Sequence, residues 1–336
     1  MNGALRPGKL PARLLSELLR EFTVAPDGSG RPGVGTVRLG PAIGEDACAI
    51  DVPEGTLVAA TDPITLAGSE VGSFAVTINA NDIAVMGVRP RWFMAAVLLP
   101  IGTTESEVRA LFTSLRNALN EITLVGGHTE ITGVVSQPVV VGQMMGFSPN
   151  RKIVPTGGVT AGDVVLQVGR APVEAAVVLA EYASRKANLP PDLLARARAA
   201  LREPGISVVE PALLAARCGA TALHDPTEGG LSSGLYELAR ASDVLLHIDE
   251  QSILWFEPGV VVCRALDADP WGALASGTLL AAFPASRVDA ALRSLSDAGF
   301  EAARIGSARP GCGVHCSDGH ALAEFERDEV ARVSSG

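Results

Sequence analysis

The stretch NANDIAVMGVRP, residues 79–90, carries the most informative pattern in the chain. Its polar residues Asn79, Asn81 and Asp82 interrupt an apolar helical pattern that runs from about residue 70 to 87. Short polar side chains of this kind lower helix propensity. Asn79 and Asp82 are three residues apart, so they share one face of a helix. We therefore predict a helix that presents an amide and a carboxylate to one ligand.

Four further clusters place a carboxylate beside small residues at expected loops or element ends. Carboxylates that converge repel each other, so a folded cluster needs protons or a divalent cation. Oxygen ligands suit Mg²⁺, which typically binds between carboxylates and substrate phosphates. Any one cluster alone is more often a turn or a helix cap. The clusters are Gly44-Glu45-Asp46-Ala47, Thr61-Asp62, Gly126-Gly127-His128-Thr129-Glu130 and His224-Asp225-Pro226-Thr227-Glu228-Gly229-Gly230.

The composition indicates a folded chain of about two domains. Its 336 residues are 47% hydrophobic and 19% charged, which supplies apolar surface for two cores. The net charge of −10 disfavours binding to nucleic acid. No stretch approaches the roughly 20 apolar residues of a membrane span. We therefore expect no membrane partner. The five cysteines are odd in number and widely spread, which indicates a reducing, cytoplasmic location.

Hydrophobic periodicity divides the chain into two α+β halves, with predicted domains at 1–150 and 151–336. The turn-rich segment 148–162 marks the boundary. In the first half we expect helices over 14–22, 70–87 and 104–119, the last with a capping box of Thr104 and Glu107, and strands over 56–61, 92–99, 122–125 and 138–147. In the second half we expect strands over 163–168, 244–249, 259–264, 277–283 and 301–306, and helices over 172–185, 191–202, 207–217, 231–241 and 286–298.

The motifs and their order resemble those of the AIR synthase (PurM-like) superfamily of ATP-dependent enzymes. GEDA at 44–47 resembles the family's GDDA, and Thr61-Asp62 resembles its next acidic strand end. Residues 79–90 resemble its N-x-[SN]-D-[IL]-A-x-M-G-x-x-P helix, a specific signal. GGHTE at 126–130 resembles GGDT, and HDPTEGGL at 224–231 resembles D-x-[ST]-x-G-G-L. The resemblance spans about residues 40–310, and it is greatest to the HypE-like hydrogenase-maturation branch.

The resemblance implies a two-domain PurM-like α+β fold and a homodimer. The N-terminal domains would pair into a shared β-barrel, each beside a larger C-terminal α+β domain. ATP would lie in a cleft, with Mg²⁺ between its phosphates and the metal ligands Asp46, Asp62, Asp82 and Asp225. The implied catalytic residues are Asp82, Asn79, Asp225 and Glu228. The implied nucleotide-binding residues are Gly44, Asp46, Asp62, Asn81, Gly126, Gly127, His128 and Thr227.

The implied reaction transfers the γ-phosphoryl group of ATP to an amide or carboxamide oxygen. The acceptor would be a small metabolite or a protein-borne carbamoyl group, and the phosphorylated oxygen becomes a leaving group. Two alternatives remain open: a small-molecule kinase like thiamine-monophosphate kinase, and a non-catalytic HypE-like regulatory or maturation subunit. Maturation partner proteins are expected only on the HypE-like interpretations.

The sequence departs from the family pattern at two places. His128 stands where GGDT has an acid, and a neutral imidazole is a poor Mg²⁺ ligand, although Glu130 is a candidate substitute. Residues 324–336 contain no cysteine, whereas HypE proteins end in a Pro-Arg-Ile-Cys tail that carries the group to be dehydrated. We therefore do not expect dehydration on a terminal cysteine of this chain.

A second constellation lies close to the C-terminus, where Cys312, His315, Cys316 and His320 occur within nine residues. The C-x₃-C spacing differs from the C-x₂-C pairs of most zinc sites. A structural β-hairpin is therefore the favoured interpretation, and a zinc site is the less favoured one.

Overall fold

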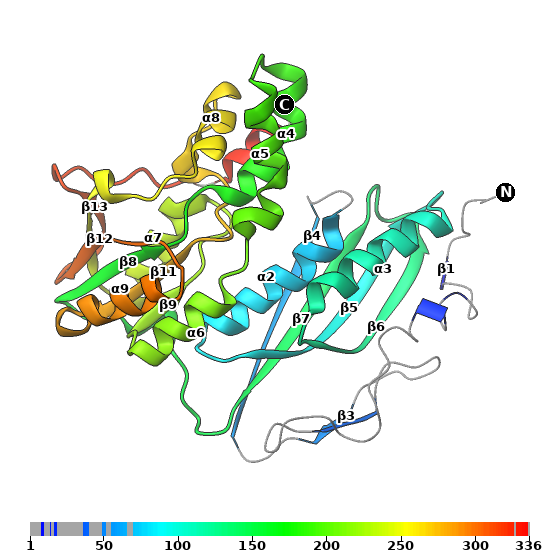
Figure 1. Ribbon diagram of the computed structural model, residues 1–336, viewed down its shortest axis with the longest axis horizontal. Helices are drawn as coiled ribbons and strands as arrows, with labels where there is room; N and C mark the ends of the chain where they lie inside the picture. The colour runs from blue at the N-terminus through cyan, green and yellow to red at the C-terminus, as the bar shows by residue number, and fades with distance from the viewer. Residues whose placement is uncertain are drawn as a thin grey trace. The chain divides into compact units, whose positions relative to one another are not determined.

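The computed structural model describes residues 8–9, 14, 17–18, 36–39, 49–51, 55–65, 70–325 and 327–334. The chain divides into two compact units, Met1–Ile83 with Val88–Lys152, and Ala84–Gly87 with Ile153–Gly336. Both units combine helices with a β-sheet, which confirms the predicted α+β class (Figure 1). The described strands form open sheets and no closed barrel. None of the described helices is long and apolar enough to cross a bilayer.

The first unit is built on a five-stranded sheet in the order β1-β6-β5-β7-β4. Strands β5 and β6 pair in parallel, and the other neighbours are antiparallel. Helices α2 and α3 cover one face of this sheet (Figure 1). The elements are β1 (Gly8–Lys9), β4 (Thr56–Ile64), α2 (Val71–Val85), β5 (Pro90–Pro100), α3 (Glu105–Leu119), β6 (Thr123–Thr132) and β7 (Val139–Ser148). A separate ribbon pairs β2 (Thr36–Leu39) with β3 (Ala49–Asp51).

Local sequence accounts for the two helices of this unit. Thr104 caps α3 as predicted: its Oγ1 accepts from the Glu107 N–H at 3.3 Å, and Glu107 Oε2 accepts from the Thr104 N–H at 2.7 Å. Helix α2 is buried on almost every side, as expected for a helix that is mostly apolar. Gly72 permits its close approach to α3, because a Cβ there would lie 2.8 Å from the carbonyl oxygen of Leu111.

The second unit contains a six-stranded sheet in the order β13-β10-β12-β8-β11-β9. One hydrophobic cluster packs α6 and α9 against this sheet, a second contains residues of α7, and a third joins α4, α5, α8 and α10. Its strands are β8 (Asp163–Val168), β9 (Ala222–His224), β10 (Leu245–Ile248), β11 (Leu279–Pro284), β12 (Ala302–Arg309) and β13 (Gly313–Cys316). Its α-helices are α4 (Val173–Lys186), α5 (Pro191–Ala199), α6 (Val209–Cys218), α7 (Gly230–Ser242), α8 (Glu257–Ala265), α9 (Val288–Asp297) and α10 (Glu329–Ser334).

One predicted strand is wrong, because residues 259–264 belong to helix α8. The apolar run Gly259-Val-Val-Val-Cys263 is too short for periodicity to separate a buried helix from a strand. In the structure Val262 and Cys263 are buried in the cluster shared with α4 and α5. A Cβ on Gly259 would lie 2.2 Å from the carbonyl oxygen of Pro172, so glycine allows the helix to pack there.

Two motifs expected at element ends lie inside strands instead. Thr61-Asp62 is within β4, and Gly126–Glu130 is within β6, which continues beyond the predicted 122–125. The register between β5 and β6 shifts beside Val125, so a bulge absorbs the irregularity and the strand continues. Leu14 and Leu18 are helical and buried, in agreement with the predicted N-terminal helix, whose other residues, except Glu17, lie outside the described part.

Candidate functional site

Asn79 connects helix α2 to strand β4. Its Oδ1 accepts a hydrogen bond from the backbone N–H of Asp62 at 2.9 Å. Its Nδ2 donates to the backbone carbonyls of Asp62 at 3.3 Å and Ala75 at 2.8 Å. Asn79 is fully buried, so these bonds satisfy an amide that water does not reach. The observed contacts show Asn79 positioning Asp62, and its catalytic role stays a prediction.

Asp82 lies one turn after Asn79 on the same helix, and its environment is unfavourable for a negative charge. Burial, followed by the nearby Asp62 carboxylate, raises the pKa of Asp82 from 3.8 to about 7. Two carboxylates at close range in a half-buried position suit a divalent cation, which attracts both and removes their mutual repulsion. The donor set of Asp62 and Asp82 therefore fits Mg²⁺. The third polar residue of the motif, Asn81, is fully buried.

Gly127 and Asp62 lie in one row of residues that pair laterally across the strands of the sheet. Gly127 pairs with Ala95, Ala95 with Gly142, and Gly142 with Asp62. The row has little space on the helix side: a Cβ on Gly142 would lie 2.4 Å from Nδ2 of Asn79. A Cβ on Gly127 would lie 2.2 Å from the carbonyl oxygen of Ala95. Gly127 also has a φ of 157°, which favours glycine. Both glycines thus allow backbone and amide groups to approach closely beside Asp62.

His128 projects from the opposite face of the sheet. Successive side chains alternate between faces, so His128 points away from the side that Gly127 and Asp62 share. His128 Nε2 lies 3.3 Å from Glu130 Oε2, and both side chains are partly exposed. The structure therefore groups His128 with Glu130 and separates it from the Asp62–Asp82 pair.

The loop between β9 and α7 holds the predicted residues of the second unit. Gly229 and Gly230 have φ values of 74° and 67°, which only glycine adopts without strain. The Gly230 N–H donates to the carbonyl of Thr227 at 3.1 Å, which closes the turn. A Cβ on Gly230 would lie 2.5 Å from the carbonyl oxygen of Trp271. Asp225 at the start of the loop is buried, whereas Glu228 at its tip is exposed.

Two acids beside this loop were not predicted from the sequence. Burial raises the pKa of Glu174 to about 7 and that of Asp328 to about 6, and the Glu228 carboxylate contributes to both. Asp328 Oδ2 accepts from the Gly229 N–H at 2.8 Å, so it also holds the loop. A lone acid in the apolar start of α4 was the available signal for Glu174. Nothing in the local sequence distinguishes Asp328 from the other acids near the C-terminus.

The predicted site residues that the structure describes are divided between the two units. Those in the first unit are Asp62, Asn79, Asn81, Asp82, Gly126, Gly127 and His128, and those in the second are Asp225, Thr227 and Glu228. Gly44 and Asp46 lie outside the described residues. Within the first group, direct hydrogen bonds and electrostatic coupling join Asp62, Asn79 and Asp82.

Comparison with known proteins gives a consistent result over both units. Residues 44–148 match the family described as AIR synthase related protein, N-terminal domain, and residues 160–317 match its C-terminal domain. The carbamoyl dehydratase HypE of Cupriavidus necator is 28% identical over 275 residues, which cover 78% of this chain and 76% of that protein. These matches confirm the resemblance predicted from the motifs.

Solved structures share the fold. The hydrogenase maturation protein HypE in complex with ATP has a TM-score of 0.75 at 22% identity, covering 95% of each chain. A chain of a HypE–HypF complex has a TM-score of 0.68 at 19% identity, covering 82% of this chain and 92% of that one. The likeness confirms the predicted two-domain PurM-like fold.

Proposed function

Since the chain belongs to the family of AIR synthase related proteins, we propose that it is an ATP- and Mg²⁺-dependent enzyme that phosphorylates an amide or carboxamide oxygen. The carboxylate pair of Asp62 and Asp82 is the observation that carries the proposal. Burial and the nearby Asp62 carboxylate raise the pKa of Asp82 to about 7, and a bound cation would reduce the repulsion between the two carboxylates. The similarity to a HypE protein in complex with ATP supports a nucleotide as the ligand.

The residues around Asp62 have distinct proposed roles. Asp62 and Asp82 would hold Mg²⁺, and Asp46 would be a further ligand by resemblance to the family. A bound Mg²⁺ would supply positive charge to neutralise the transferred phosphoryl group. Asn79 keeps Asp62 in place through its two hydrogen bonds to the Asp62 backbone. Gly127 allows the Ala95 backbone to approach closely in the row of paired residues that contains Asp62.

A carbamoyl group is the acceptor that the comparisons favour. The relative from Cupriavidus necator is a carbamoyl dehydratase. In such a reaction the amide oxygen takes the γ-phosphoryl group and then leaves as phosphate, so that the amide loses the elements of water. The likeness to a chain of the HypE–HypF complex supports a maturation protein as partner.

The assembly that we propose is a homodimer through the first unit. The sheet face opposite α2 and α3 carries Leu57, which is 48% exposed, and Ala59 on the same side of β4. A second copy that covered this face would bury the apolar surface and bring two open sheets together. Sedimentation of the full chain measures the oligomeric state directly, and a monomer at all concentrations would contradict this assembly.

Calorimetry of the full chain with ATP tests the proposed function. We expect binding in Mg²⁺ and none in EDTA, with loss of the Mg²⁺-dependent binding in Asp62→Asn and retention in Glu121→Gln, an exposed acid of the same unit. Persistent binding in Asp62→Asn would remove the pair from the site. ADP release can then be measured with an S-carbamoyl peptide and with thiamine monophosphate. Stimulation by thiamine monophosphate alone would favour the kinase alternative, and ATP binding without any turnover would favour a regulatory subunit.

A further inference from the structure

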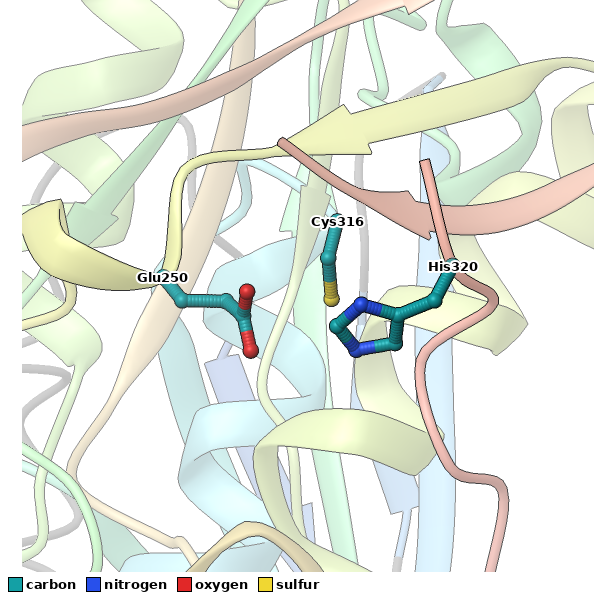
Figure 2. Close-up of side chains that lie close together, drawn as sticks. All are labelled: Glu250, Cys316 and His320. Atoms are coloured by element: carbon teal, nitrogen blue, oxygen red, sulfur yellow. The ribbon is translucent and has the colours of Figure 1, made fainter. Parts of the chain in front are cut away.

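The ends of two parallel strands bring three metal-binding side chains together in the second unit. Strands β10 and β13 pair in parallel, with Ile248 opposite Cys316. Parallel strands end at the same edge of a sheet, so the chain that continues to Glu250 lies beside the chain that turns after Cys316. Figure 2 shows the side chains of Glu250, Cys316 and His320 directed toward one another. One ligand atom of each lies within 4.8 Å of the other two.

Local hydrogen bonds hold the two segments in this arrangement. After Cys316 the chain makes a tight turn, in which the Gly319 N–H donates to the Cys316 carbonyl at 3.0 Å. The Cys316 N–H donates to the His320 carbonyl at 2.8 Å, so these two residues face each other across the hairpin. Glu250 begins a short 3-10 turn, Glu250–Ser252, whose cap Asp249 accepts from Ser252 Oγ at 2.6 Å. Each segment is therefore held by hydrogen bonds within its own turn.

Of the four Cys and His residues in the motif, Cys316 and His320 lie in the cluster, and the acid that joins them is Glu250. Burial alternates along β13, so Cys316 is buried on one face while His315 lies on the other. Cys312 is exposed in the turn before the strand. The C-x₃-C spacing thus does not describe the cluster, since only Cys316 and His320 converge and Glu250 completes the set.

Acidic side chains surround the Cys316 thiol, since Glu250 and Asp318 both lie beside it. The thiol is hydrogen-bonded to Glu250, and a bound metal ion would take the place of its proton. Asp318 Oδ1 contacts Nδ1 of His320 and accepts from the His320 backbone N–H at 3.1 Å. This leaves Nε2 for the metal, in the carboxylate–histidine arrangement that orients metal-bound imidazoles.

We propose that Glu250, Cys316 and His320 bind one zinc ion, which links the C-terminal hairpin to the segment after β10. Thiolate, imidazole and carboxylate together suit Zn²⁺, whereas Mg²⁺ prefers oxygen ligands alone. The charges of the thiolate and the carboxylate balance that of the ion. Ligand atoms around a tetrahedral zinc lie about 3.5 Å apart, so the three atoms must close by roughly 1 Å. Glu250 is only half-buried and His320 is exposed, so both side chains have room to move.

Cobalt and zinc titrations of the full chain, free of any polyhistidine tag, test this site. With Co²⁺ as the probe we expect one equivalent to bind and to produce the near-ultraviolet thiolate-to-cobalt charge-transfer band. Zn²⁺ should displace the cobalt and abolish the band. A chain that binds no cobalt, or binds it without this band, would overturn the proposal.

Matched variants from the same hairpin identify the ligands. Cys316→Ser should lose the band, whereas Cys312→Ser should retain it in full. Cys316 is buried and its replacement also affects packing, so His320→Ala and Glu250→Gln repeat the test at positions with solvent contact. Asp318→Asn should weaken zinc binding by about 10- to 100-fold through the loss of imidazole orientation. Full zinc affinity in His320→Ala and Glu250→Gln, or loss of the band in Cys312→Ser, would refute the assignment.

Discussion

Replacement of Asp82 with asparagine is expected to stabilise the metal-free protein and to abolish its Mg²⁺-dependent ATP binding. The pKa of this carboxyl rises from 3.8 to about 7 on folding, because the site is buried and Asp62 is close. The difference corresponds to an upper limit of about 4 kcal/mol for the cost of the folded-state charge. Asp82 keeps some solvent contact, so we expect about half of this, about 2 kcal/mol.

The sign of the pH dependence follows from linkage. Below pH 3.8 both states hold the proton, and Asp82 contributes nothing. Between pH 3.8 and about 7 the unfolded chain releases its proton first, so stability falls as the pH rises. Above about pH 7 the full cost is present. Asparagine has no such charge, so the advantage of the variant should grow from pH 5 to pH 8.

Thermal unfolding in EDTA measures this advantage. At pH 8 Asp82→Asn should melt about 4–8 °C above the wild type, if the cost is about 2 kcal/mol and the first unit unfolds independently. Mg²⁺ should raise the melting temperature of the wild type and leave that of the variant unchanged. Glu121→Gln controls for removal of one exposed charge in the same unit. An Asp82→Asn protein that is no more stable at pH 8, or whose advantage does not change with pH, would refute the reasoning.

Two further substitutions test other contacts. Gly127→Ala should destabilise the first unit by about 1–3 kcal/mol, because its Cβ would lie 2.2 Å from the Ala95 carbonyl oxygen. Gly126→Ala is the control, because its Cβ would lie 3.9 Å from the nearest atom, and it should unfold in urea like the wild type. Equal stability of the two variants would contradict the close approach. Asp328→Ala should cost about 1–3 kcal/mol, because it leaves the buried Gly229 N–H without its acceptor. Denaturant unfolding measures the loss, and unchanged stability would show that the bond is dispensable.

Elements with strong local signals were predictable from the sequence. The capping box of Thr104 and Glu107 marks the start of α3, because the residues that satisfy the first amides of a helix are close in sequence. The run at 259–264 was predicted as a strand and forms α8, because its valines suit either element when buried. Contacts with α4 and α5 favour the helix there, and these contacts come from outside the segment.

The same distinction applies to the site. The motif at 79–90 correctly predicted that Asn79 and Asp82 lie on one helix. It did not predict the hydrogen bonds between the Asn79 amide and the Asp62 backbone in β4. The sheet face on which His128 lies depends on the register of β6 against β5, which the motif does not contain. Gly44 and Asp46 stay predictions, since they lie outside the described residues.

The amino-acid sequence by itself determined the family, the helix that carries Asn79 and Asp82, and the presence of the acidic motifs, because each depends on residues near one another along the chain. Only the tertiary structure decided which side chains meet. Glu250 joins Cys316 and His320 because β10 and β13 pair in parallel, and Asp328 reaches Gly229 because the C-terminal segment packs on the loop before α7. Such contacts arise from strand register and packing between distant segments, which local spacing does not encode.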